Sequence, residues 1–265
     1  MQIVQNVIHS RASIVWNVSR MRYLVLSDIH ANLAAFEAVL EDAGDFDFIW
    51  CLGDVIGYGP DPNECVARLR ECPHISLSGN HDWAALGKLD LRGFNTDARL
   101  SAEWTQKQLD PGARAYLHDL PPSRVESGYT LAHGSPRQPV WEYILDPVTA
   151  TLNFGAFDTV ICLVGHTHIP AMYFMPEGAG DRRRCQVRTP QLNRSLHLNS
   201  GRWIINPGSV GQPRDGNADA SYAMLDLDEK RWEFRRVRYP VKETQRRMRE
   251  QGLPARLIER LAHGQ

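Results

Sequence analysis

Short groups of carboxylate, amide and imidazole side chains recur along this sequence, each directly after an apolar run. The runs are typical of buried β-strands and cover residues 23–26, 46–52, 75–78, 129–132 and 159–164. The polar residues that follow them are Asp28 and His30, Asp54, Asn80 and His81, His133, and His166 and His168. Because ligand sites of open α/β sheets gather at the carboxyl ends of strands, we expect these side chains to lie together.

Such a cluster calls for a bound cation, because buried carboxylates and imidazoles are costly without compensating charge. The candidate ligands offer oxygen or imidazole nitrogen, which suits Mn²⁺, Fe²⁺/Fe³⁺, Ni²⁺ or Zn²⁺ and disfavours a thiolate site. Seven ligands are enough for two divalent metal ions. Two ions about 3.5–4 Å apart can clamp the attacking and leaving oxygens of a phosphoryl displacement. We therefore expect a binuclear metal centre.

The sequence Gly79-Asn80-His81-Asp82 places three different polar groups side by side. An amide oxygen is a hard ligand that never changes protonation, so we assign Asn80 to a metal. His81 then stays free of metal and can protonate the departing oxygen. Asp82 is left to orient or solvate its neighbours.

The ordered motifs resemble those of the calcineurin-like metallophosphoesterases, in particular their small bacterial and archaeal members. The motifs are Asp28-x-His30, Gly53-Asp54, Gly79-Asn80-His81-Asp82, His133 and Gly165-His166-x-His168, and the resemblance spans about residues 21–215. It implies an α/β (α+β) fold, a four-layer α/β/β/α sandwich of two mixed sheets. It also implies that one ion is held by Asp28, His30 and His168, the other by Asn80, His133 and His166, with Asp54 as the bridge.

The implied activity is hydrolysis of a small phosphorylated substrate by a metal-bound hydroxide. The substrate would be a phosphodiester, a phosphomonoester or a nucleotide anhydride. Gly57 and Tyr58 stand where phosphoprotein phosphatases of this superfamily carry Asp and Arg, which disfavours a phosphoprotein. Two alternatives stay open: an inactive binding or scaffold module, disfavoured by the complete ligand set, and a nuclease, disfavoured by the lack of a basic stripe.

A second glycine-rich loop, Asn206-Pro-Gly-Ser-Val-Gly-Gln-Pro-Arg-Asp-Gly216, follows the apolar run 203–205. Backbone N–H groups in such a turn can cradle an anion, and an arginine can clamp a phosphate. We therefore predict that Ser209 and Arg214 bind substrate. The alternative is a tight surface turn.

The chain reads as a single domain over residues 21–265 with an N-terminal extension over 1–20. The extension is expected to be loosely packed, although residues 3–8 could form an edge strand. A helical insertion is expected over about 83–120 and closing helices over about 244–262. Strands without intervening helices after residue 170 predict an antiparallel arrangement there.

Composition limits the partners and the compartment. The net charge of −1 gives no general reason to expect nucleic acid, and residues 1–20 resemble neither a signal peptide nor a membrane span. Five cysteines without Cys-x-x-Cys spacing suggest reduced thiols in the cytoplasm. Trp83, Trp104 and Trp141 could line the pocket, but core packing is the favoured reading. The oligomeric state is left open.

Overall fold

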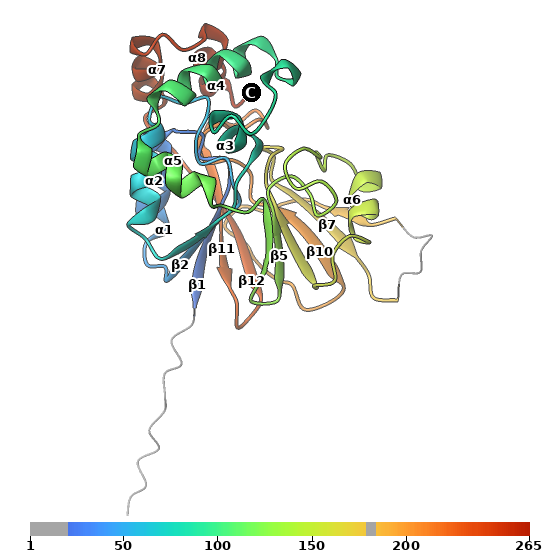
Figure 1. Ribbon diagram of the computed structural model, residues 1–265. Helices are drawn as coiled ribbons and strands as arrows, with labels where there is room; N and C mark the ends of the chain where they lie inside the picture. Colours follow the sequence, from blue (N-terminus) through green and yellow to red (C-terminus); the bar gives the residue numbers. More distant parts are fainter. Residues whose placement is uncertain (1–20, 179–183) are drawn as a thin grey trace, which may run out of the picture.

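Two six-stranded sheets face each other in the computed structural model, which describes residues 21–178 and 184–265 (Figure 1). The predicted extension over residues 1–20 lies outside the described residues. The first sheet has the order β3 (His74–Ser76), β2 (Phe48–Cys51), β1 (Arg22–Leu26), β11 (Ala220–Asp226), β12 (Arg231–Val237) and β9 (Ser195–His197). The second has the order β4 (Ser123–Glu126), β5 (Tyr129–Ala132), β6 (Ile161–Val164), β10 (Arg202–Asn206), β7 (Ala171–Met175) and β8 (Gln186–Arg188).

Both sheets are mixed. In the first, β1 and β2 are parallel, with Leu24 opposite Ile49, whereas β1 and β11 are antiparallel. In the second, β5, β6 and β10 run parallel, and β10 pairs antiparallel with β7. The strands after residue 170 are therefore not purely antiparallel as predicted, because β10 is inserted between β6 and β7 and pairs differently with each.

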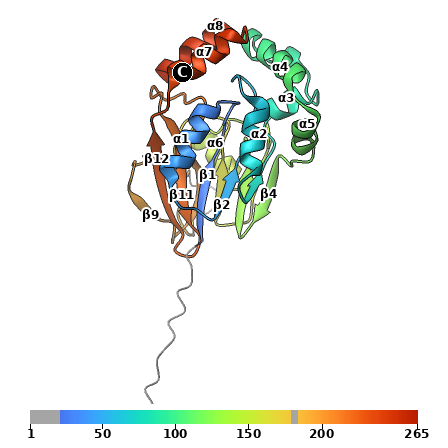
Figure 2. The same ribbon diagram turned by 90° about the vertical axis from the view of Figure 1, so that its left-hand side faces the viewer.

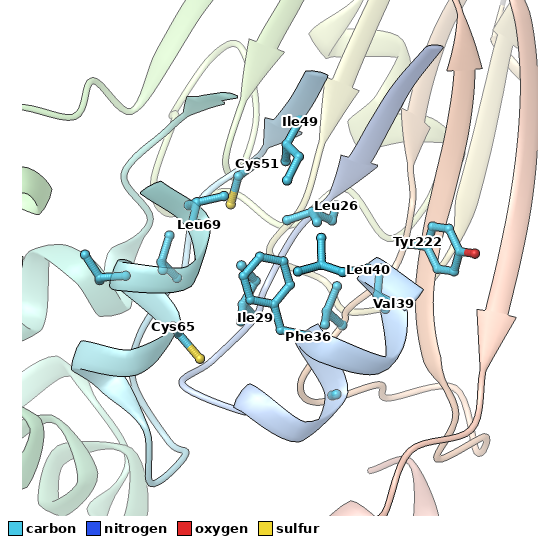
Figure 3. Packing of buried hydrophobic residues seen from close by; sticks show 14 of the residues in the cluster. Leu26, Ile29, Phe36, Val39, Leu40, Ile49, Cys51, Cys65, Leu69 and Tyr222 are labelled. Carbon is cyan, nitrogen blue, oxygen red and sulfur yellow. The ribbon is translucent and has the colours of Figure 1, made fainter. Parts of the chain in front are cut away.

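Helices cover the outer face of each sheet, which gives four layers and confirms the predicted sandwich. The first sheet carries α1 (Leu33–Ala43), α2 (Pro62–Arg70) and α5 (Pro111–His118), and the second carries α6 (Pro147–Asn153) (Figures 1 and 2). Alternate residues of β1 serve the two sides: Leu24 and Leu26 pack under the helices, and Tyr23 and Val25 pack between the sheets. Figure 3 shows Phe36 of α1 with Leu26 among the buried side chains under the helices.

A separate group of helices lies at the end of the sandwich toward which β1 runs (Figure 1). It consists of α3 (Asn80–Ala85), α4 (Thr96–Gln108), α7 (Val241–Glu250) and α8 (Ala255–Arg260), with short 3₁₀ helices at Leu91–Gly93 and Leu261–His263. A small apolar cluster that includes Ala98, Met248 and Leu257 joins α4, α7 and α8. Tyr58, in the loop after β2, belongs to the same cluster.

None of the helices in the described part of the chain has the length and apolar character needed to cross a membrane.

Candidate metal centre

The loops after five strands bring the seven predicted ligands to one place. Asp28 and His30 follow β1, Asp54 follows β2, Asn80 follows β3, His133 follows β5, and His166 and His168 follow β6. Each of these side chains is at most 4% exposed. The parallel strands of both sheets therefore end around a single buried polar cluster.

Two groups within the cluster have the spacing of metal sites. Asp28, His30 and His168 form one, and Asp54, His133 and His166 form the other, each with ligand atoms within 4.8 Å of one another. His168 Nε2 lies 3.3 Å from Asp28 Oδ1, and His133 Nε2 lies 3.4 Å from Asp54 Oδ2. Each group takes residues from both sheets, so the centre lies at the junction of the two.

Two further contacts connect these groups. Asp54 Oδ2 lies 3.4 Å from His133 Nε2 and 3.6 Å from His30 Nε2, so the same oxygen faces both groups. Asn80 Oδ1 lies 3.2 Å from His133 Nε2, beside the second group. This geometry is compatible with Asp54 as a bridge and Asn80 as a further oxygen ligand.

Backbone carbonyls determine which imidazole nitrogen faces the centre. Nδ1 lies against a carbonyl oxygen in three rings: 2.9 Å from Leu52 O for His133, 2.6 Å from Gln212 O for His168, and 3.3 Å from Ile56 O for His30. A carbonyl only accepts, so Nδ1 carries the hydrogen and Nε2 presents a lone pair. This is the orientation in which a neutral imidazole can bind a metal ion through Nε2.

The centre contains buried acceptor atoms that a cation would satisfy. Nε2 of His30 and Nε2 of His168 are 3.1 Å apart, and in the tautomers given above both present lone pairs that repel. Asp28 Oδ1, Asp54 Oδ2 and His166 Nε2 are buried without a hydrogen-bond partner. Unpartnered buried acceptors are rare and costly, so these residues fit divalent ions.

The electrostatics of the centre fit the same conclusion. Burial raises the pKa of Asp28 to about 7 and lowers the pKa of His166 to about 3. Burial alone would also lower the pKa of His133, but the negative charge of Asp54, whose Oδ2 lies 3.4 Å from His133 Nε2, raises it to about 9. A cation at this position would displace the His133 proton and pair with the carboxylates.

Several ligands have an unusual backbone conformation. Asp28, His30, Asp54, His166 and His168 have φ between +50° and +65°, the left-handed region that residues other than glycine rarely adopt. Each such residue costs about 1–3 kcal/mol. Because the conformation recurs at five ligands, the fold holds this strain at the site.

Asp82 anchors the loops that carry the ligands. Its carboxylate accepts from the backbone N–H groups of Asp54 and Gly79, each at 2.9 Å, and of Ile56 at 3.1 Å. Gly79 is needed there because a Cβ would overlap the Asp54 carboxylate. Asp82 thus orients the neighbours of Asn80 and does not face the centre itself.

Comparison with known proteins agrees with this geometry. The calcineurin-like phosphoesterase superfamily domain matches residues 21–230, most of the chain. The chain belongs to this superfamily.

Two relatives and one solved structure show how far the likeness extends. A metallophosphoesterase structure from Sphaerobacter thermophilus is 49% identical, with a TM-score of 0.84, over 93% of this chain and 100% of that one. Protein MJ0912 of Methanocaldococcus jannaschii is 36% identical over 91% of this chain and 97% of that protein. Phosphodiesterase YfcE of Escherichia coli K12 is 28% identical over 78% of this chain and 89% of that protein.

His81 lies beside the two ligand groups but belongs to neither of them. Burial lowers the pKa of His81 to about 4; the negative charge of Asp54 opposes this effect, and the positive charge of Arg214 adds to it. Its Nδ1 is buried without a partner, and its ring centroid lies 4.2 Å from that of Tyr58. The imidazole is thus available to a molecule that binds at the centre.

The two predicted substrate residues differ in their surroundings. Ser209 Oγ donates to Asp28 O at 2.9 Å and accepts from Gln212 N at 2.8 Å, so it joins its loop to the first ligand group. A contact between Ser209 and substrate stays a prediction, and it would require this buried hydroxyl to give up a bond. Arg214 is half-buried and places Nη2 3.4 Å from Tyr58 OH.

Aromatic side chains that the motifs did not indicate border the centre. Tyr143 stacks on His166 with ring centroids 3.9 Å apart, and Phe94 lies 5.5 Å from His81. Trp141, 43% exposed, lies 5.8 Å from Phe94 and is not the core residue we expected. Trp104 does pack against the apolar cluster of α4, α7 and α8. No spacing rule in the sequence connects Tyr143 or Phe94 with the ligands.

Proposed function

We propose that this chain is a binuclear metal-dependent phosphoesterase that hydrolyses a small phosphorylated substrate. A phosphodiester or a nucleotide anhydride is preferred over a phosphomonoester as the substrate class. The observation that carries the proposal is the pair of buried ligand groups facing one oxygen of Asp54. A scaffold that never bound cations would gain nothing from burying these unpartnered acceptors.

The protein's own residues would divide the work as follows. Asp28, His30 and His168 hold one ion, Asn80, His133 and His166 hold the other, and Asp54 bridges them. When bound, the two ions would supply the nucleophile at neutral pH and neutralise charge that develops on the phosphoryl oxygens.

Two residues would act on the substrate directly. Arg214 orients the phosphoryl group through its planar guanidinium. His81 gives a proton to the departing oxygen. A phosphate anion beside His81 favours the protonated imidazole, which offsets the effect of burial on its pKa.

The ion identities and the compartment belong to the same proposal. Oxygen and imidazole ligands suit Mn²⁺, Fe²⁺/Fe³⁺, Ni²⁺ or Zn²⁺. All five cysteines are free thiols, which supports a cytoplasmic location.

The test is turnover of bis-p-nitrophenyl phosphate with added Mn²⁺, together with metal analysis. Asp54→Asn should lose most of the activity and bound metal, because a neutral amide is a poor bridge between two cations. Asp45→Asn removes an exposed carboxylate outside the centre and serves as the matched control. If the parent binds two metal equivalents but turns over no phosphoester, the protein is a binding module.

A further inference from the structure

Two arginines from distant parts of the chain meet on the ring of Tyr58. The guanidinium carbon of Arg214 lies 5.8 Å from the ring centroid, and that of Arg260, the last residue of α8, lies 4.7 Å from it. Both donate to Gln212 Oε1, from Arg214 Nη2 at 3.3 Å and from Arg260 Nη2 at 2.5 Å. The two cations are therefore neighbours.

In the described part of the chain this pair has no carboxylate within the 4.0 Å of an ion pair. Neither arginine forms an ion pair within residues 21–178 and 184–265, and the oxygen they share belongs to a neutral amide. Nε of each guanidinium is buried without a hydrogen-bond partner. The repulsion between two adjacent positive charges is costly, and so are buried N–H donors without acceptors. An anion between the two guanidiniums would relieve both costs.

The pair lies one aromatic ring away from the metal centre. The ring of Tyr58 is 4.7 Å from that of His30 and 4.2 Å from that of His81, measured between centroids. Arg260 lies beyond residues 21–230, the part of the chain that matches the superfamily domain.

We propose that Arg260, together with Arg214, binds a second phosphate group of the substrate, adjacent to the one that is hydrolysed. The inference rests on the proposed function, because it assigns a substrate class to that same site. A phosphate presents three oxygens, and two planar guanidiniums can each offer it paired N–H donors. The substrate class is then a phosphoanhydride or another molecule with two neighbouring phosphates.

The experiment measures binding by calorimetry, with Mn²⁺-loaded protein. The ligands are AMP and α,β-methylene-ADP. The second carries one additional phosphonate group, and the methylene group that joins its two phosphorus atoms is not hydrolysed. Arg260→Gln removes the charge, Arg260→Lys keeps it without the guanidinium fork, and Arg256→Gln removes an exposed charge from the same helix. Thermal melting of each variant verifies folding, and Arg260→Lys supplies the comparison if Arg260→Gln does not fold.

The parent should bind α,β-methylene-ADP at least about tenfold more tightly than AMP, as expected for a charge-assisted contact. Arg260→Gln should reduce this ratio to less than about threefold, Arg260→Lys should give an intermediate ratio, and Arg256→Gln should keep the parent ratio. A ratio that is the same in Arg260→Gln and the parent would overturn the proposal, because chelation of the ions by the diphosphate is common to both.

Methylenediphosphonate, which has no nucleoside, identifies what Arg260 recognises. Equal weakening of this ligand and α,β-methylene-ADP in Arg260→Gln supports a phosphate site; weakening of the nucleotide alone overturns it. Binding is read separately from turnover. A parent without phosphoesterase activity but with Arg260-dependent binding refutes the proposed function alone, and an active parent without that dependence refutes this inference alone.

Discussion

Asn80, His81 and Asp82 are neighbours along the chain, yet each has a different environment. Asn80 Oδ1 faces His133, the carboxylate of Asp82 accepts three backbone N–H groups, and His81 lies beside the rings of Tyr58 and His30. The three polar groups can therefore have three different tasks: ligand, proton donor and anchor.

Replacing His81 and Asn80 in turn separates the first two tasks. His81→Ala should retain its metal, lose about 10²–10⁴ in rate on alkyl phosphates, and lose much less on nitrophenyl esters, whose leaving group needs no proton. Asn80→Ala should lose metal and fail on both substrates. Metal analysis beside rates on the two ester types checks this. Half the parent's metal in His81→Ala, or equal loss on both esters, would make His81 a ligand or a positioning group.

For the individual residues of the site, the sequence predicted which side chains meet but not their detailed surroundings. The seven candidate ligands could be found because each follows an apolar strand. Arg260 could not, because it ends a helix that is remote in sequence and its neighbour Tyr58 is brought close by tertiary packing alone. The left-handed backbone at Asp28 or His168 has no sequence signal either, since neither is a glycine.

Among the elements, the start of α1 has contacts that few helix caps have. Asn32 Oδ1 accepts from Ala35 N at 3.2 Å, which caps the helix, and also from Thr244 Oγ1 at 2.9 Å on α7. Its Nδ2 donates to Gly211 O at 2.9 Å. One buried amide thus joins α1, α7 and the loop that carries Arg214.

Asn32→Ala should accordingly lower the free energy of unfolding by more than the loss of a helix cap alone. We expect a decrease of about 3 kcal/mol in the free energy of unfolding, because two buried groups lose their partner as well. Asn95→Ala is the matched control: Asn95 is exposed and caps α4 through one bond to Ala98 N, so it should cost about 1 kcal/mol. Urea denaturation measures both, and equal costs would show that the links to α7 and Gly211 add nothing.

The elements that the sequence did not reveal are short or weakly patterned. β4 and β8 have four and three residues, none of which is buried, and neither shows an apolar run. α6 contains Val148, Thr149 and Thr151, which disfavour helix, although Asp146 caps it and Pro147 occupies its first turn. Burial of Ala150 against the second sheet decides its conformation.

For the whole molecule, we expect stability to depend on metal, because the centre has unpartnered acceptors and left-handed backbone. Ions that bind only the folded state at 100 times their dissociation constant add about 2.7 kcal/mol. Chelation should therefore lower Tm by about 5–10 °C, and Mn²⁺ should restore it. Thermal melting with and without chelator measures this shift. Asp54→Asn should show a much smaller shift of Tm. If chelation leaves the Tm of the parent unchanged, the protein lacks a structural metal site.

The position of the centre between the sheets has a kinetic consequence. Asp28, His30 and Asp54 belong to one sheet, and His133, His166 and His168 belong to the other. A partly folded chain with only one sheet formed has neither complete ligand set, so ions can engage only after the two sheets have docked. Ions that bind only the docked sheets would stabilise the native state relative to such partly folded chains, so we expect bound metal to slow unfolding and to lengthen the lifetime of the native state.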